Sequence, residues 1–260
     1  MEKKEPHFIN PLHINIPMPT SASPLPIWRP EACIPRKEIL EGKLTDAELA
    51  LRLSTVISGQ AKPPYNDPET FYEATHLTRN MKTIINDVLA RLARKGREIN
   101  PIIVLDVGFG GGKTHTLVAL YYAAKYGNNP KIKERLGNPP IPENVRIVAI
   151  SGEDYGDKGV NRNGTLIKTI WGDFFYQLGK YKKYKELDTK MQVPSPTDLK
   201  EALEGGPVLI LLDELPTYLN LVASKRNMLD KTIQWIQRLV IAVSEKEDAA
   251  LVVAIAEDVY

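Results

Sequence analysis

The stretch from Leu105 to Thr116 contains the residue types that bind a triphosphate, in the order LDVGFGGGKTHT. Only a glycine-rich turn lets several backbone N–H groups approach phosphate oxygens closely. The N–H groups of Gly110 to Thr114 are predicted to point at the phosphates, above the positive end of the following helix. Lys113 would reach the β- and γ-phosphates, and the Thr114 hydroxyl would bind Mg²⁺. The predicted nucleotide-binding residues are Phe109, Gly110, Gly111, Gly112, Lys113, Thr114, His115 and Thr116.

This stretch fits the P-loop pattern except at its first glycine. Val107 stands six residues before the lysine, and glycine follows at Gly108 instead. The substitution is expected to reshape the mouth of the loop. An ordinary glycine-rich surface loop is the alternative, and the position between a predicted strand and a predicted helix argues against it.

Two carboxylates, Asp213 and Glu214, follow the apolar run Val208 to Leu212. An acid at the tip of a strand near the phosphate loop would order the Mg²⁺ shell, which assigns Asp213 to the metal together with Thr114. A glutamate beside it can orient and deprotonate water, which makes Glu214 and Lys113 the predicted catalytic residues. Acids also follow strands for solubility alone, but the two motifs together predict ATP and Mg²⁺ as ligands.

The pair of acids favours hydrolysis over phosphoryl transfer to an acceptor. The chain contains no Asn-Lys-x-Asp guanine reader, and no arginine-rich lid of a small-molecule kinase can be located. A nucleotide-gated binding module with little hydrolysis and a DNA-dependent motor both remain alternatives. The second of these predicts stimulation by DNA that weakens steeply with salt.

Alternating strand and helix patterns predict the elements that position these residues. The apolar runs 102–107, 145–151, 208–213 and 251–256 are typical of strands buried on both faces of a parallel sheet. Between them lie helical patterns at about 113–126, 166–178, 196–203 and 227–244. Right-handed crossovers between such strands predict a three-layer α/β sandwich with a mainly parallel sheet.

The strand at 251–256 suits a place beside the phosphate-loop strand, where related ATPases present a polar sensor. The candidates here are Glu257 and Asp258, with a solvated strand end as the alternative. The sequence stops at Tyr260, so a fifth strand, a lid and an arginine finger are expected to be absent or supplied by another chain. Arginine fingers are worth ~10³–10⁵ in rate, so this piece is expected to bind ATP better than it hydrolyses it.

Composition places the chain among globular proteins. It has 260 residues, 43% hydrophobic and 25% charged, with a net charge of +2. This balance excludes disordered, collagenous and disulfide-stapled classes, and it neither favours nor excludes nucleic acid. No apolar run approaches the ~18–20 residues that cross a bilayer, and no secretory signal is readable. A single cysteine, Cys33, fits a reducing cytoplasm.

Three regions are predicted along the chain. Residues 1–35 contain eight of the twenty prolines and predict an extended arm or a partly disordered tail. Residues 36–98 predict a helical segment, with a capping box at Thr45 to Glu48, a stop at Gly59 and an apolar stripe from Met81 to Leu92. Residues 99–260 are predicted to form the ATPase core.

Three other features have two interpretations each. Lys180 to Lys185 interleaves cations with tyrosines, as a single-strand-binding surface would, but an exposed helix or loop face is favoured. Gly152 to Gly164 could contact a substrate or partner, although a plain surface loop is favoured. Trp171, Phe174 and Phe175 fall at helical spacing and are predicted to be core.

These motifs resemble one family: large prokaryotic P-loop ATPases of the AAA-like class, catalogued as a domain of unknown function. The resemblance covers about residues 36–260 and rests on the following segments: Glu38 to Leu44, Asp67 to Tyr72, Thr75 to Thr78, Phe109 to Thr116, Ala119 to Tyr121 and Leu212 to Glu214. Members also lack the early glycine, so Val107 would be a family trait.

The resemblance implies an AAA-like fold of the ASCE type and only the amino-terminal part of a longer protein. Members resemble switches that act on protein partners or DNA and are sometimes associated with defence against phages. We therefore expect an ATPase that drives conformational change in a larger assembly. The resemblance is compatible with an oligomer, and no membrane partner is expected. His76, Leu77 and Thr78 occupy the place where relatives form the adenine pocket.

Overall fold

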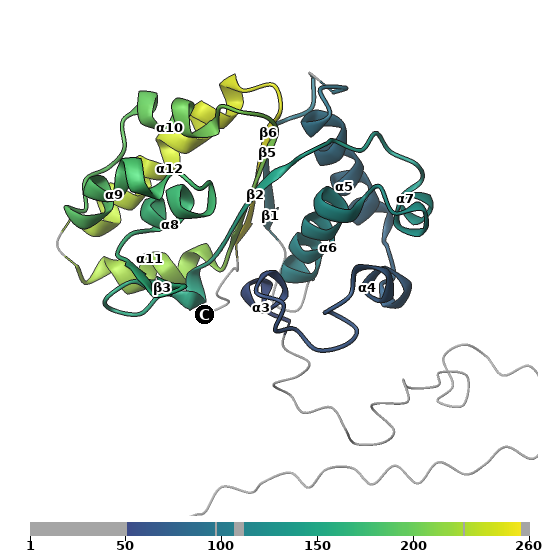
Figure 1. The fold of residues 1–260 in the computed structure, drawn as a ribbon, viewed down its shortest axis with the longest axis horizontal. Coiled ribbons are helices and arrows are strands. Elements are labelled where there is room, and N and C mark those ends of the chain that lie inside the picture. Colours follow the sequence, from purple (N-terminus) through teal and green to yellow (C-terminus); the bar gives the residue numbers. More distant parts are fainter. Residues whose placement is uncertain (1–50, 97, 107–111, 226, 256–260) are drawn as a thin grey trace, which may run out of the picture. The chain divides into compact units, whose positions relative to one another are not determined.

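A parallel four-stranded sheet organises the protein. The computed structural model describes residues 51–96, 98–106, 112–225 and 227–255, and these residues belong to one compact unit. The strand order is β1 (Ile102–Asp106), β6 (Ala249–Ile255), β5 (Val208–Asp213) and β2 (Arg146–Ser151). All three neighbouring pairs are parallel, so the carboxyl ends of the four strands lie at one edge (Figure 1).

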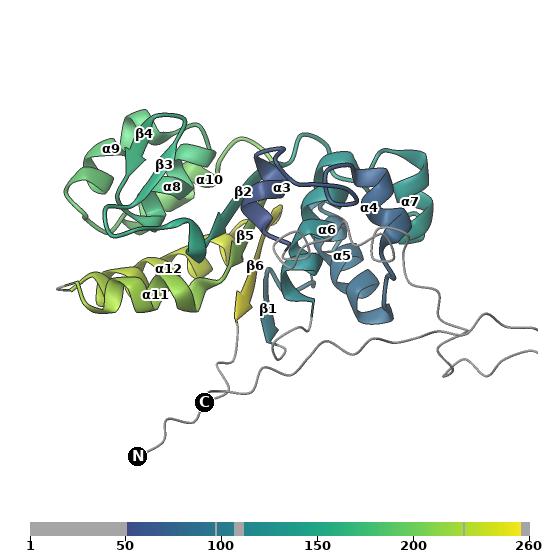
Figure 2. The same ribbon diagram turned by 90° about the horizontal axis from the view of Figure 1, so that it is seen from below.

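Helices cover both faces of this sheet. On one face lie α3 (Leu53–Ile57), α4 (Pro68–Ala74), α5 (Arg79–Leu92), α6 (Lys113–Tyr126) and α7 (Pro130–Leu136). On the other lie α8 (Ile170–Gln177), α9 (Tyr181–Thr189), α10 (Pro196–Leu203), α11 (Leu215–Ala223) and α12 (Met228–Glu245). Figures 1 and 2 show the two helical layers with the sheet between them. The predicted α/β class with a mainly parallel sheet is confirmed.

β2, β5 and β6 divide their side chains between two apolar cores. Val104 of the outer strand β1 is 52% exposed, so the prediction of burial on both faces is wrong for this strand. In β6, Leu251 and Val253 pack with α8, α11 and α12, whereas Val252 and Ala254 pack with α5 and α6. Side chains alternate across a strand, so both faces must be apolar when both are covered. This is the physical reason for the continuous apolar runs in the sequence.

The amino-terminal helices belong to the same unit as the sheet. Arg91 on α5 is buried and donates to the carbonyl oxygens of Ala249 (2.7 Å), Lys246 (2.9 Å) and Ile99 (3.0 Å). These bonds tie α5 to the start of β6. The predicted arm at 1–35 and the capping box at Thr45 to Glu48 lie outside the described residues.

The helix predicted over 166–178 begins later than expected, and that prediction was wrong at its start. Residues Val160–Arg162 (β3) and Thr165–Ile167 (β4) instead form an antiparallel hairpin. Asn163 and Gly164 both take positive φ, 49° and 82°, as a two-residue hairpin turn requires. The helix starts at Ile170 because the Thr169 side chain accepts from the N–H of Gly172 and caps it.

The tyrosines of the 180–185 segment turn inward. The Tyr184 ring is buried and stacks on Phe175 at 4.1 Å between centroids, and the Tyr181 hydroxyl donates to Asp188 at 2.8 Å. The segment is therefore a helix with an exposed lysine face, as favoured. Trp171, Phe174 and Phe175 are fully buried, which confirms their assignment to the core.

A buried ion pair fixes the hairpin to α8. The Arg162 guanidinium donates to Asp173, whose carboxylate is fully buried, at 2.7 Å. The Tyr155 hydroxyl donates to the same carboxylate at 2.9 Å. Removing one partner of such a pair leaves an uncompensated buried charge.

We therefore expect Asp173→Ala to lower the free energy of unfolding by about 3–5 kcal/mol. Chemical denaturation followed by circular dichroism measures it. Asp230→Ala, which removes an exposed acid from α12, is the matched control and should cost less than about 1 kcal/mol. Similar losses in the two variants would contradict the role given to the ion pair.

Candidate functional site

The two predicted motifs meet at the carboxyl edge of the sheet. β1 leads toward Gly112 and α6, and β5 ends at Asp213. β6 separates the two strands, and all of them run parallel. Lys113, Thr114 and the acidic pair are therefore brought to the same end of the fold (Figure 2).

The two motifs lie close to each other. The side chain of Thr114, in the first turn of α6, lies near enough to the Asp213 carboxylate to lower its pKa. Asp213 itself is almost fully buried, at 3% exposure, whereas Thr114 and Lys113 are half-buried. A hydroxyl and a carboxylate supply oxygen ligands of the kind that Mg²⁺ prefers.

Gly112 begins α6 in the left-handed region, with φ 76° and ψ 22°. A Cβ atom there would meet nothing within 4 Å, so backbone conformation rather than space favours glycine at this position. Phe109, Gly110 and Gly111 lie outside the described residues, so their predicted roles stay predictions.

Burial, together with the negative charges of Glu214 and Glu153, raises the pKa of Asp213 from 3.8 to about 6. The nearby Thr114 side chain and the hydrogen bond from the Glu214 N–H partly offset this rise. Carboxylates gathered in a low-dielectric site hold negative charge at a cost, which a bound cation would relieve.

This pKa has a consequence for stability. Between pH 3.8 and about 6 the folded protein binds more protons at Asp213 than the unfolded chain does, so stability falls as pH rises through that window. We expect Asp213→Asn to stabilise the nucleotide-free protein at pH 7 by about 1–3 kcal/mol and to give no gain near pH 4. Thermal melts at the two pH values measure it; equal shifts at both would contradict the account.

Glu214 is held in an uncommon conformation. Its φ of 49° and ψ of 40° are left-handed values that a non-glycine residue adopts at a cost. Its N–H donates to Asp213 Oδ1 at 3.1 Å, and the Thr217 hydroxyl donates to its Oε2 at 3.4 Å. A Cβ atom at Gly152 would lie 2.0 Å from the Glu214 carbonyl oxygen. The backbone after β2 therefore packs closely against the backbone of Glu214, and a residue larger than glycine would not fit at position 152.

Two other predicted residues have their side chains engaged inside the protein. His115 Nε2 lies 2.9 Å from the Thr75 hydroxyl, and its ring lies 4.7 Å from that of Phe71. The Thr116 hydroxyl and N–H both bond to the Gly112 carbonyl, each at 2.9 Å. The side chain of His115 thus links α6 to α4, and Thr116 stabilises the first turn of α6.

The segment expected to form an adenine pocket lies beside a cavity. His76 and Leu77 help to line a space of about 650 Å³, together with Thr75, Lys82 and Arg135. The Thr75–His115 contact connects this segment to the start of α6.

Three residues near the site were given no individual role from the sequence. Glu153 follows β2, and its negative charge acts on Asp213. Arg52 Nε lies 3.6 Å from Glu153 Oε2, which brings a guanidinium toward this edge. Gly152 provides the space for Glu214. An acid directly after an apolar strand run was the available signal for Glu153.

Within the described ranges, no group of three or more His, Cys, Asp or Glu residues is arranged to hold a metal. Thr114 and Asp213 could therefore hold Mg²⁺ only with oxygen ligands from elsewhere, such as phosphates and water. The described helices include none long and apolar enough to cross a bilayer.

Comparison with known families assigns the chain. The family model described as the DUF499 N-terminal domain matches residues 34–259. The chain belongs to the DUF499 family. The resemblance to a domain-of-unknown-function family is thereby confirmed. No curated protein and no solved structure matches this DUF499 chain.

Proposed function

We propose that this DUF499 domain binds ATP with Mg²⁺ and hydrolyses it. The observation that carries the proposal is the closeness of the Thr114 side chain to the Asp213 carboxylate. A hydroxyl that follows Lys113 at a helix start thus lies beside a buried carboxylate at a strand end, and P-loop NTPases hold Mg²⁺ with this pair of residue types. The proposed fold type is an incomplete P-loop sandwich of the AAA-like, ASCE class.

The strand order supports this fold type. β6 lies between β1, which precedes the glycine-rich stretch, and β5, which carries the acids. A sensor at the tip of β6 would therefore face the phosphates. The sensor candidates Glu257 and Asp258 lie outside the described residues, so that role stays a prediction.

Each residue has one task in the proposed mechanism. Lys113 and the first N–H groups of α6 hold the β- and γ-phosphates. Thr114 and Asp213 bind Mg²⁺, which would neutralise charge on the phosphate oxygens. Glu214 orients a water and accepts its proton as the water oxygen attacks the γ-phosphorus. The bond from that phosphorus to the β,γ-bridging oxygen breaks, which gives inorganic phosphate and ADP.

The left-handed backbone at Glu214 supports its catalytic role. Residues in strained backbone conformations cluster at functional sites, and both Gly152 and Asp213 contact the backbone of Glu214. Hydrolysis would drive a conformational change that a protein partner or the rest of a longer chain senses. DNA as a partner is a further hypothesis.

Phosphate release from ATP tests the proposal. Release that requires Mg²⁺ and ATP together is the expected result, at a low rate if an arginine has to come from another chain. Tight ATP binding without phosphate release would favour the alternative, a nucleotide-gated interaction module. No ATP binding at all would overturn both.

A further inference from the structure

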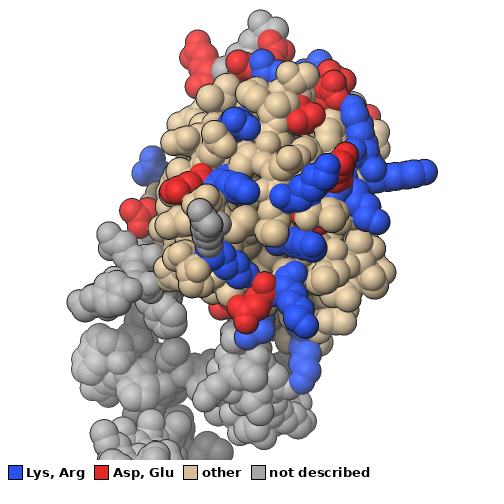
Figure 3. All heavy atoms as spheres, turned by 90° about the vertical axis from the view of Figure 1, so that its left-hand side faces the viewer, with Lys and Arg blue, Asp and Glu red and all other residues tan. Residues whose placement is uncertain are grey.

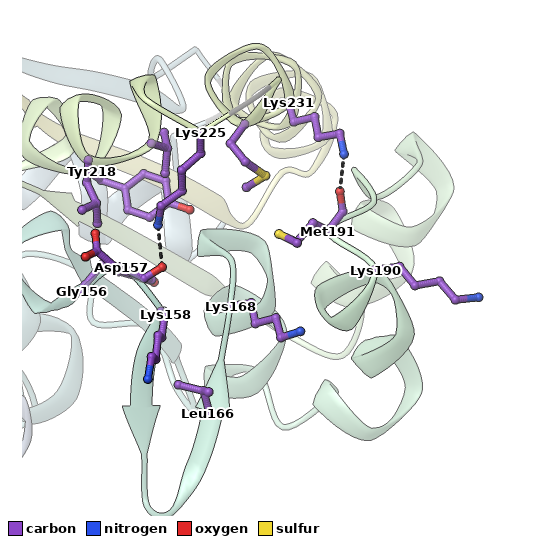
Figure 4. A pocket seen from close by; sticks show the side chains of 15 residues that line it. Gly156, Asp157, Lys158, Leu166, Lys168, Lys190, Met191, Tyr218, Lys225 and Lys231 are labelled. Carbon is purple, nitrogen blue, oxygen red and sulfur yellow. Dashed lines mark hydrogen bonds between the residues drawn. The ribbon is translucent and has the colours of Figure 1, made fainter.

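A cavity of about 570 Å³ lies on the opposite helical layer from α6. It is bounded by the hairpin β3–β4, by the segment Tyr155 to Gly159, by the end of α9, and by α11 and α12. Figure 4 shows lysines at its rim and methionine and tyrosine side chains between them. Of the residues proposed for the ATP site, those that the structure describes do not line it.

Positive charge dominates the rim. The lining lysines are Lys158, Lys168, Lys190, Lys225 and Lys231. Lys190 pairs with Glu186, but the other lysines have no carboxylate partner among the residues that the structure describes. Figure 3 looks onto this side of the molecule, where lysine and arginine side chains, with some acidic ones among them, surround an uncharged surface.

Two of these ammonium groups are held in place. Lys225 donates to the carbonyl oxygen of Asp157 at 2.7 Å, and Lys231 donates to that of Met191 at 2.9 Å. In Figure 4 these two lysines come from the α11–α12 side, while Lys158 and Lys168 come from the hairpin side. An anionic group that enters the cavity would therefore be approached from two sides.

The cavity also has apolar walls. Leu166 is 49% exposed and Met191 is 39% exposed, and Met228, Leu221 and Val222 continue the surface. Contiguous apolar surface with a polar rim marks contact sites in proteins. Methionine side chains adapt to different apolar partners.

The aromatic residues argue against nucleic acid as the occupant. Tyr155 and Tyr218 line the cavity but are 7% and 1% exposed, so their ring faces are not open to bases. Their hydroxyls bond to Asp173 and to the N–H of Ile170. Single-strand binding depends on aromatic stacking, whereas lysine ammonium groups and aliphatic walls suit carboxylates beside apolar side chains.

We propose that this cavity binds a peptide segment of a protein partner in which acidic residues alternate with aliphatic ones. The aliphatic side chains lie against Leu166 and Met191, and the carboxylates pair with Lys158, Lys168, Lys225 and Lys231. Such a complex is favoured by charge complementarity at the rim and by apolar burial at the centre.

Two segments, α11 and the loop after β2, run from the candidate ATP site to the cavity. α11 starts directly after Glu214, and its Val222 lines the cavity. The loop after β2 begins at Gly152, which contacts Glu214, and continues to Tyr155 and Gly159 at the cavity. A nucleotide effect on peptide binding rests on the proposed function, whereas peptide binding itself does not.

The test is fluorescence anisotropy with a short labelled peptide of alternating glutamate and leucine, first without nucleotide. Saturable binding is expected, and Lys158→Glu/Lys168→Glu should weaken it about tenfold or more. Lys182→Glu/Lys185→Glu makes the same charge change on exposed lysines of α9 that do not line the cavity, so it should change binding less than about twofold.

A glutamate–serine peptide should bind at least about tenfold more weakly than the leucine peptide, because the apolar contacts are lost. Absence of peptide binding, equal weakening in both lysine pairs, or preference for a labelled oligothymidine would each overturn the proposal. Repeating the titration with ATP and Mg²⁺ examines the coupling separately. If nucleotide does not change the peptide affinity, the proposed coupling between the two sites is wrong, but the proposed peptide site stands.

Discussion

Glu214→Gln is expected to bind ATP like the wild type and to release phosphate about 10²–10⁴-fold more slowly. Glutamine keeps the size of the side chain and its bond from Thr217, at 3.4 Å in the wild type, but it cannot accept a proton from water. A phosphate-release assay at saturating ATP, with binding measured in parallel, separates the two effects.

Glu153→Gln is the matched control for this variant. Glu153 also follows a strand at the same edge, and its negative charge acts on Asp213, but its Oε2 pairs with Arg52 at 3.6 Å. We expect its hydrolysis rate to change by less than about tenfold, as for an exposed charge. Equal turnover by the wild type and Glu214→Gln would refute the assignment of the general base.

Lys113→Ala is expected to lose ATP binding, by about 10²-fold or more. The lysine is the first residue of α6, where its ammonium would add charge-assisted bonds to the phosphates that the backbone N–H groups already hold. Such bonds are each worth about 1.5–3 kcal/mol. Calorimetric titration with ATP and Mg²⁺ measures the loss.

Lys125→Ala provides the comparison, because Lys125 lies in the last turn of the same helix and bonds to the Tyr121 hydroxyl at 2.9 Å. It should bind ATP with the wild-type affinity. Unchanged affinity in Lys113→Ala, with the fold intact by circular dichroism, would exclude Lys113 from the phosphate site.

The bounds of the strands could be predicted closely because buried strands are marked by continuous apolar runs in the sequence. Strands covered on both faces must be apolar throughout, so the run at 208–213 coincides with β5 and the run at 145–151 differs from β2 by one residue. α6 was predicted at its observed bounds because Gly112 precedes it and Gly127 follows it.

Other elements had weaker local signals. Leu166 fits the apolar spacing of a helix, but the turn at Asn163 and Gly164 places it in β4. The apolar spacing carries no information about that turn. α11 follows a left-handed Glu214 with no side-chain cap, so Pro216 in its first turn was the signal available for its start.

Which residues gather at the site depends on contacts between segments that are distant in the sequence, so only some of them could be predicted. Thr114 and Asp213 could be paired from the sequence because each motif has a known place at a strand end. Gly152 and Glu153 could not, since their nearness to the acids depends on the register of β2 against β5, where Ser151 lies opposite Asp213. Register is a property of the folded sheet and of no single segment.

The central claim is that Thr114 and Asp213 complete a magnesium site for a nucleotide held at the start of α6. Calorimetric titration of the wild-type chain with ATP, once with Mg²⁺ and once with excess EDTA, tests it most directly. The account predicts saturable binding of one ATP that weakens at least about tenfold without the metal. Absence of binding, or binding of equal affinity in both buffers, would contradict it.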